Sequence, residues 1–404
     1  MKKAFISSLI MTLMVANISL ANIFSVQAAT TDNTVATTDN TIKVSLDNIR
    51  DIMSENNLDM KVYYNNQQLA KEEYENAKDV TIPDLEAAEK TAQDNYDNFT
   101  LAADGLNATD QIKFKTALTS ATSALENAQN NLTTLKYNLR SANIEYEQKV
   151  EKAVYQAQQD YIKYLSYLSD EQLNEDTVKS QEKVVQVSKL KYDYGFISKN
   201  EYTSSLQNNT DSINKYNESK DAEELAKTNL YTTLGISSGE KVTFNTDINE
   251  DFAKISKINY NDDLAKMLDN NVDIQLQNIA IDKLNDQIDA ETTTTDYTDT
   301  IDQYNTDNNQ ILLKQKMSDA EASFKGQYNI LMNSYNSIKS SYDEIIQKQK
   351  EYQTIQTKYD YGFASKKEVD DAKLALDNDS STFNASKNTL YVNYLRYIQM
   401  KEGY

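Results

Sequence analysis

Apolar residues recur every seven positions along residues 114–192, the most regular segment of the chain. One series of six runs from Leu118 to Ala153, and a second series from Phe114 to Ala142 fills the partner position of each heptad. This pattern predicts a long helix whose apolar seam packs against other helices. At 1.5 Å per residue, the helix would be about 115 Å long.

A second heptad series, in residues 324–359, again has six apolar members at intervals of seven, and Tyr328, Tyr335 and Tyr342 widen its apolar stripe. A wide stripe is typical of a helix with several neighbours, so we expect the protein to associate with itself. Each long segment is followed by a further helical pattern, so the chain is predicted to form two long antiparallel hairpins. These return patterns are carried by Tyr202, Leu206, Ile213, Tyr216, Ala226 and Leu230 in the first hairpin, and by Val369, Leu376, Phe383 and Leu390 in the second.

The segments that precede the long helices also resemble each other. Residues 44–78 and 258–291 each contain helical apolar patterns that are interrupted by two consecutive asparagines. Residues 242–245 form a short candidate strand between the two halves. The paired openings and hairpins predict an internal duplication, with one repeat at 42–246 and the other at 247–404. In the first opening, the second helix is expected to be carried by Met60, Tyr63, Leu69 and Tyr74.

One six-residue phrase occurs twice between the long helical patterns. Lys-Tyr-Asp-Tyr-Gly-Phe stands at residues 191–196 and again at residues 358–363. Glycine just past a helix end can adopt the left-handed conformation that closes the helix. A serine follows each phrase, with a glutamate three residues later, which is the signature of a capping box at a helix start. The chain is therefore predicted to have two matching hairpin tips, at 194–197 and 361–364. The predicted capping residues are Ser198, Glu201, Ser365 and Glu368.

The aromatic residues of these tips are candidates for docking a partner. The turns are too tight for a long side chain to fold back into the seam, so the rings are expected to be exposed. Exposed aromatic side chains are typical anchors for the groove of a partner. The alternative is a duplicated turn that serves only the fold. The candidate docking residues are Tyr194, Gly195, Phe196, Tyr361, Gly362 and Phe363.

The composition favours a helical protein and argues against catalysis. One proline and seven glycines in 404 residues leave few helix breakers. The chain has no cysteine and no histidine, which removes thiolate chemistry and the commonest general base and transition-metal ligand. We therefore expect no enzyme activity, no catalytic residues, no metal and no cofactor. The formal charge of −21 argues against nucleic acid and anionic lipid as partners.

Residues 1–29 have the features of a secretory signal peptide. Lys2 and Lys3 precede an apolar run, and residues 26–28 form a small-residue cleavage site. An uncleaved membrane anchor is the alternative, because the run is long. Residues 30–41 are rich in threonine, asparagine and aspartate, and are expected to be a disordered linker. The mature chain is expected in the cell envelope or outside the cell.

On these features the chain resembles the TolC family of outer-membrane efflux proteins over nearly all of its mature length. The likeness is carried by the paired openings, the long coiled helices, and the Tyr-x-x-Gly tips that end at Gly195 and Gly362. The resemblance implies a homotrimer in which twelve long helices form a hollow barrel. It also implies that the tips dock a periplasmic adaptor and an inner-membrane pump, and that the assembly exports drugs or proteins.

The family also implies an outer-membrane location, with membrane strands between Lys78 and Phe114 and between Ala290 and Met317. Such strands need about ten residues of alternating apolar and polar character. The first region instead has a helical pattern around Pro83, and the second is polar and rich in threonine. We therefore expect a divergent, all-α member with little or no β structure, whose mature chain does not span the membrane.

Two functions fit these observations. The first is a TolC-like efflux or secretion component, an elongated helical conduit that docks a pump or adaptor through its tips. The alternative is a structural or adhesive coiled-coil protein of the cell envelope that transports nothing. A conduit needs tips that bind a partner and helix faces that close a ring, whereas a spacer needs only its seam.

Overall fold

The computed structural model describes residues 41–101, 108–246, 252–290 and 295–404. The expected signal peptide and residues 30–40 of the expected linker lie outside this part of the chain. The chain divides into two compact units, Met1–Thr41 and Ile42–Tyr404. The description below concerns the second unit.

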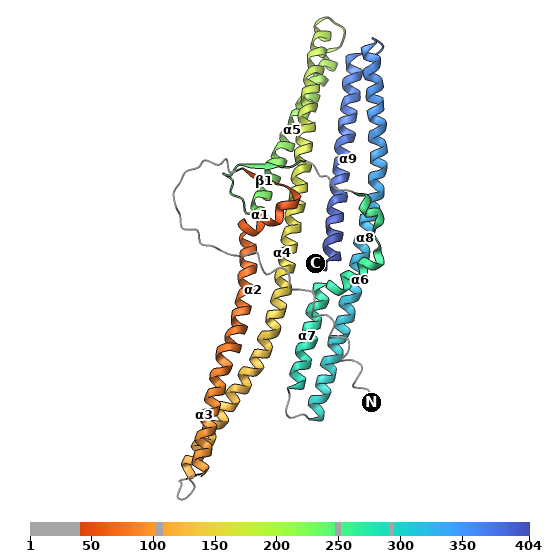
Figure 1. The fold of residues 1–404 in the computed structure, drawn as a ribbon. Coiled ribbons are helices and arrows are strands. Elements are labelled where there is room, and N and C mark those ends of the chain that lie inside the picture. Colours follow the sequence, from red (N-terminus) through yellow and green to blue (C-terminus); the bar gives the residue numbers. More distant parts are fainter. Residues whose placement is uncertain (1–40, 102–107, 247–251, 291–294) are drawn as a thin grey trace. The chain divides into compact units, whose positions relative to one another are not determined.

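Helices make up most of this unit (Figure 1), as the heptad patterns predict. In the described ranges, none of these helices is both long and apolar enough to cross a membrane. The elements in chain order are β1 (Ile42–Val44), η1 (Leu46–Asn48), α1 (Ile49–Asn56), α2 (Leu58–Asn76), η2 (Ala77–Thr81), α3 (Ile82–Leu101), α4 (Ala108–Asp193), α5 (Lys199–Leu234), β2 (Val242–Phe244), η3 (Phe252–Lys257), α6 (Tyr260–Asn270), α7 (Val272–Asp289), α8 (Asp296–Asp360) and α9 (Lys366–Lys401).

The two expected hairpins are present. Helix α4 has 86 residues, which corresponds to about 130 Å, and it packs against α5. Helix α8 packs against α9 in the same way. Around Pro83, where the sequence predicts a helix, α3 follows α2 through the π-helical turn η2. Proline lacks the amide that an α-helical ladder requires, which accounts for a wider turn immediately before it.

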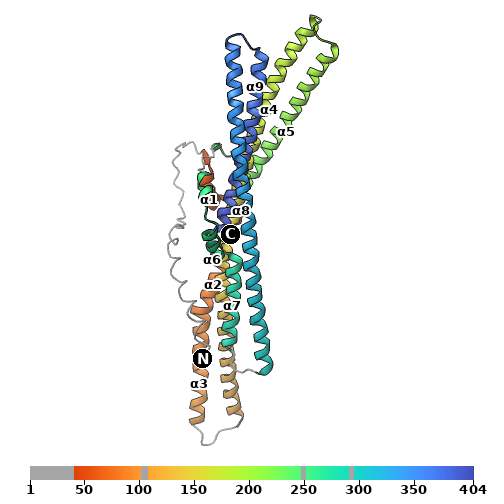
Figure 2. The same ribbon diagram turned by 90° about the vertical axis from the view of Figure 1, so that its right-hand side faces the viewer.

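The helices pack in two partly overlapping series that share α4 and α8. In one series α2 packs on α4, α4 on α7, and α7 on α8. In the other, which includes the hairpin tips, α5 packs on α4, α4 on α9, and α9 on α8 (Figure 1). Helix α8 continues from its pairing with α7 to its pairing with α9 (Figure 2). As a result, α8 forms one edge of both series, and α2 and α5 form the opposite edge.

Two apolar clusters hold the hairpins to the shorter elements. The first joins α1, α4 and α5 through residues such as Met53, Tyr161 and Leu230. The second joins α6, α8 and α9 through Met267, Phe324, Leu331, Leu390 and Tyr397. Five of the six heptad residues of the second series, from Phe324 to Tyr352, are buried or half-buried. The heptad positions therefore do form the seam.

The tyrosine stripe on α8 does not have the role that its spacing suggested. Tyr328 packs within the chain, 5.0 Å from the ring of Tyr260, and Tyr335 packs on the second apolar cluster. Tyr342 is exposed, with Phe383 as its ring neighbour at 6.0 Å. All three rings therefore have neighbours in their own chain, so the width of this stripe is not an argument for self-association.

The little β structure consists, in the described residues, of two three-residue strands. Strands β1 and β2 pair in parallel, with Ile42 opposite Val242 and Val44 opposite Phe244. The candidate strand at 242–245 is thus confirmed for Val242–Phe244. Its partner β1 was not expected from the sequence, because a strand this short gives no local signal and its partner lies 200 positions away.

Each opening has a helix break at its second asparagine. The side-chain oxygen of Asn57 accepts the amide of Met60 at 3.0 Å, and that of Asn271 accepts the amide of Ile274 at 3.1 Å. A left-handed glycine lies against each break: Gly235 against Asn56, and Gly403 against Asn270. A side chain at either glycine would collide with backbone atoms, so these contacts require glycine.

Candidate functional site

Each hairpin tip begins where a long helix is closed by its glycine. In the first tip, the amide of Phe196 donates to the carbonyl of Lys191 at 2.7 Å, and the amide of Gly195 to that of Tyr192 at 2.9 Å. In the second, the amide of Phe363 donates to the carbonyl of Lys358, also at 2.7 Å. This pair of bonds is the Schellman motif. Its glycine has a φ of 77° in both tips, a value that L-residues with side chains rarely adopt.

The next helix of each hairpin starts with the expected capping box. The hydroxyl of Ser198 accepts the amide of Glu201 at 3.2 Å, and the carboxylate of Glu201 accepts the amide of Ser198 at 2.7 Å. Ser365 and Glu368 repeat these bonds at 3.3 and 2.6 Å. The bond from the serine amide stabilises the carboxylate and lowers the pKa of both glutamates. Only two residues, one of them the phenylalanine, separate each glycine from its N-cap.

The aromatic side chains of both tips are exposed, as the tight turn predicts. Tyr194, Phe196, Tyr361 and Phe363 have between 75% and 83% of their surface in solvent. A Cβ added to Gly195 or Gly362 would meet no atom within 4 Å, so nothing in the described chain covers the turns. Each tip therefore presents one tyrosine and one phenylalanine on a backbone that is fixed by hydrogen bonds.

The two tips differ just behind the turn. In the first, the rings of Tyr192 and Tyr202 stack at 5.4 Å. In the second, Val369 takes the place of Tyr202 and is buried, and the ammonium group of Lys366 lies 5.8 Å from the ring of Tyr359. The exposed aromatic residues are the same in both tips, while the supporting contacts differ.

The tips are nearly neutral in a strongly acidic chain. Lys191 and Lys199 balance Asp193 and Glu201 in the first tip, and residues 358–368 carry three lysines against two acids. Apolar contact, more than charge, is therefore what the tips offer a partner. Acidic side chains in the described ranges also do not gather into a group that could hold a metal ion.

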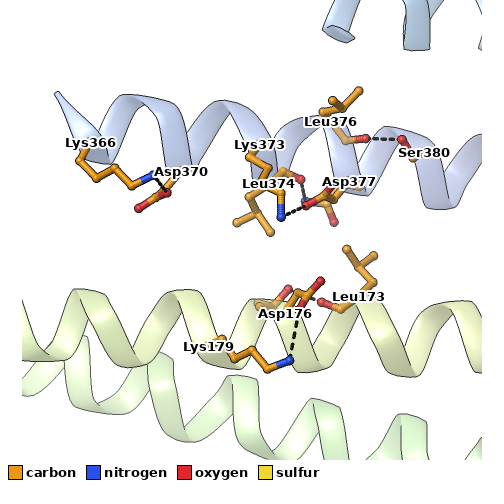
Figure 3. Close-up of polar contacts among 12 residues, drawn as sticks. Leu173, Asp176, Lys179, Lys366, Asp370, Lys373, Leu374, Leu376, Asp377 and Ser380 are labelled. Atoms are coloured by element: carbon orange, nitrogen blue, oxygen red, sulfur yellow. Dashed lines mark hydrogen bonds and ion pairs between the residues drawn. The ribbon is translucent and has the colours of Figure 1, made fainter. Parts of the chain in front are cut away.

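Charged residues on α4 and α9 behind the tips pair within their own helices (Figure 3). Lys366 contacts Asp370 at 3.0 Å and Lys373 contacts Asp377 at 3.7 Å on α9, while Lys179 contacts Asp176 at 3.4 Å on α4. Polar contacts between these two helices lie farther from the tips, at Ser166–Asn388 and Asp170–Ser381. Among the residues drawn, ion pairs therefore stabilise single helices rather than the contact between hairpins.

A second surface was missed by the sequence analysis: the outer edges of the two helix series. On α2, the helix expected from Met60 and Leu69 is present, but Met60 is buried whereas Leu69 is exposed. On α5, Ser205, Ser219 and Ala226 are buried, while Leu206 and Ile213 are exposed.

Between Ser205 and Ala226 the seam of α5 thus includes small residues at intervals of seven, with Leu206 and Ile213 left outside it. The sequence contains a signal for this packing, namely small residues at intervals of seven: Ser205, Ser212, Ser219 and Ala226. Leu206 and Ile213 each follow one of these small residues directly. Small residues allow close helix packing, and the bulkier side chains are then displaced to the edge.

Comparison with known proteins gives a fold. No protein-family model and no curated protein matches the chain. Among solved structures, CusC is 12% identical, with 90% of this chain and 94% of CusC covered and a TM-score of 0.60. The open outer-membrane channel MtrE of Neisseria gonorrhoeae is 11% identical, with 89% of both chains covered and a TM-score of 0.52.

The outer-membrane channel CmeC of Campylobacter jejuni is 12% identical, with 68% of both chains covered and a TM-score of 0.54. At such low identity these likenesses establish the fold alone. The expected TolC-like helical architecture is confirmed: this chain has the fold of the outer-membrane channel proteins to which it is similar.

Proposed function

We propose that the protein is a TolC-like component of a cell-envelope efflux or secretion system, in which several copies form an elongated helical conduit. The observation that carries the proposal is a likeness to channel structures over 90% of the chain, combined with two exposed aromatic tips on hairpins of the same design. The proposed location is the cell envelope, to which a signal peptide at residues 1–29 directs the chain.

In this proposal the two tips dock an adaptor or a pump. Tyr194, Phe196, Tyr361 and Phe363 are the docking side chains. Gly195, Gly362 and the two capping boxes hold them in place. The equal turns and the matching helix breaks at Asn57 and Asn271 also support our proposal of a duplicated chain, with repeats at 42–246 and 247–404.

The test is the double variant Phe196→Ser/Phe363→Ser. Both rings are exposed, so helicity and melting temperature are expected to stay nearly unchanged. The fraction of an adaptor or pump that copurifies from the native host, identified by mass spectrometry, is expected to fall sharply. Ile112→Ser is the matched control, because Ile112 is an exposed apolar residue of α4 outside the tips; it should leave the partner bound.

A double variant that keeps its partner would remove the tips from the proposed mechanism. If no adaptor or pump copurifies with the native protein either, the structural or adhesive coiled-coil function becomes the better explanation. Loss of helicity in the double variant, but not in the control, would instead show that the rings stabilise the turns.

A further inference from the structure

Two short helices, α1 and α6, lie near the start of each half of the chain, and each packs against the return helix of its own half, α5 or α9. The same parts hold both opening helices in place. Met53 of α1 and Met267 of α6 are 0% and 1% exposed, and each stands four residues before the asparagine at the helix break. A left-handed glycine, Gly235 or Gly403, follows each return helix and lies against that break. These shared parts do not distinguish one opening helix from the other.

The side chains around the shared parts differ in chemistry between the two halves. In the first half, Ile49 and Ile52 of α1 and Leu234 of α5 belong to one buried apolar cluster. The matching positions of the second half are counted from the helix break and from the glycine, and they hold Asp263, Lys266 and Glu402. Charged groups in one half thus stand where the other half has aliphatic side chains.

The charged groups of the second half form two ion pairs of opposite direction. Asp263 of α6 contacts Lys401 of α9 at 2.7 Å, and one turn later Lys266 contacts Glu402 at 2.5 Å. The side chain of Asp263 is 13% exposed, and it also accepts a hydrogen bond of 2.7 Å from the buried Tyr397. A shift of α9 by one residue would bring Asp263 towards Glu402, which has the same charge. The order of the charges therefore favours one register as well as one partner.

An exchange of partners would leave these charges without counterions. If α6 packed on the end of α5, Asp263 would stand beside Thr233. Lys266 would then stand beside Leu234, and the aliphatic side chains of α1 would face the charged end of α9. A buried charge that loses its partner is strongly unfavourable, whereas an intact buried ion pair is no more stabilising than apolar contacts in its place. Such pairs are therefore better suited to selecting a partner than to adding stability.

We propose that the two ion pairs make each opening helix pack on the return helix of its own half. In a chain with two similar halves, the exchange of equivalent elements is a characteristic folding error, within one chain or between copies. The ion pairs oppose this error by raising the free energy of the exchanged arrangement. This selection of partners is independent of the proposed function, because it concerns how the chain folds.

The absence of cysteine from the chain allows three added cysteines to report the pairing. Glu55 of α1, Asp269 of α6 and Thr232 of α5 are exposed, and Glu55 and Asp269 directly precede the residues against which the glycines lie. The reporter Glu55→Cys/Thr232→Cys/Asp269→Cys is purified as full-length protein, unfolded in urea, refolded and treated with a flexible bismaleimide. Mass spectrometry of the digested protein then compares two links. The link from position 232 to 55 marks the correct pairing, and the link from 232 to 269 marks the exchanged pairing.

With the ion pairs intact, the correct link is expected in more than about tenfold excess, because unpaired charges disfavour the exchange. A second reporter makes the contact of α6 apolar through five further changes: Asp263→Ile, Lys266→Ile, Tyr397→Phe, Lys401→Thr and Glu402→Leu. It is expected to give the two links in comparable amounts while regaining its helices. The matched control, Lys266→Glu/Glu402→Lys, exchanges two charges that remain complementary, and it should give the same excess as the intact chain.

An apolar reporter that gives the correct link alone would overturn the proposal, because shape would then determine the pairing. Comparable links in the intact chain or in the charge-exchanged control would overturn it as well. Circular dichroism verifies the folding of each reporter. If the apolar reporter does not fold, Lys266→Ile/Glu402→Leu replaces it, since these side chains are 45% and 43% exposed. Its exchanged link is expected to rise by about threefold, and an unchanged ratio of the links would overturn the proposal.

Discussion

The hydroxyl of Tyr137 on α4 donates a hydrogen bond of 2.5 Å to the carboxylate of Asp286 on α7. Lys136 contacts the same carboxylate at 3.2 Å, and Arg140 pairs with Asp282 at 3.0 Å one turn away. Tyr137 is buried, and burial together with this bond raises its pKa above the ordinary range. The cluster joins a helix from the first half of the chain to one from the second.

Replacing Tyr137 by phenylalanine should weaken this junction. The side chain of Asp286 is 44% exposed, so water replaces part of the lost bond, and the expected loss in free energy of unfolding is about 1 kcal/mol. Urea unfolding followed by circular dichroism measures it. Tyr297→Phe, at an exposed ring on α8, is the control and should have no effect. Equal stabilities of the two variants would mean that the bond contributes nothing.

Alanine at either tip glycine should destabilise the protein, whereas alanine at a glycine inside a helix should stabilise it. Gly195→Ala and Gly362→Ala force a side chain into a left-handed conformation, at a cost of about 1 kcal/mol or more each. Gly326 lies inside α8 with open space around it, so Gly326→Ala should stabilise the protein by about 0.5–1 kcal/mol. Thermal unfolding of the three variants tests the opposite signs. A stabilising Gly195→Ala would contradict the turn geometry.

Alanine at Gly235 should cost more than alanine at Gly195. Both glycines are left-handed, but a Cβ at Gly235 would lie 2.6 Å from the backbone of Asn56, whereas Gly195 has no neighbour within 4 Å. Overpacking against backbone atoms adds about 1–3 kcal/mol to the conformational cost. Comparing the unfolding midpoints of Gly235→Ala and Gly195→Ala measures the difference, and equal midpoints would rule out a tight contact at Asn56.

The capping boxes should make the tips sensitive to acid. The pKa values of Glu201 and Glu368 are lowered from 4.5 in the folded chain, so the unfolded chain binds protons more readily. Their stabilising effect is present above that value and is lost as the pH falls through the lower, folded pKa. The double variant Glu201→Gln/Glu368→Gln is expected to lower the melting temperature at about pH 7 and to have little effect at about pH 3. An equal decrease at both pH values would contradict this linkage.

The tips were predictable because their signals are local. A glycine stop such as Gly195 and a capping box such as Ser198 with Glu201 act within a few residues, so their geometry follows from adjacent positions. The heptads at Phe324 and Leu331 were equally informative, because their spacing alone places them on one face of a helix. The docking role of the exposed rings is not decided by this geometry and stays a proposal.

The outer edges were not predictable in the same way. Leu69 and Leu206 look like seam residues by type and spacing, yet both are exposed. Which face of α2 is covered depends on α4, whose partner residues stand some 76 positions away at the Gln67–Asn143 contact. The pairing of β1 with β2, and of Tyr137 with Asp286, depends on contacts at still greater separation.

The sequence by itself therefore determined the helical class, the two hairpins, the glycine-closed tips and the breaks at Asn57 and Asn271. Tertiary structure decided which apolar faces are buried, and that α2 and α8 become the edges of a helix series. The physical reason is that caps, turns and heptads are specified by neighbours along the chain, whereas the burial of a helix face is specified by whichever distant helix comes to lie on it.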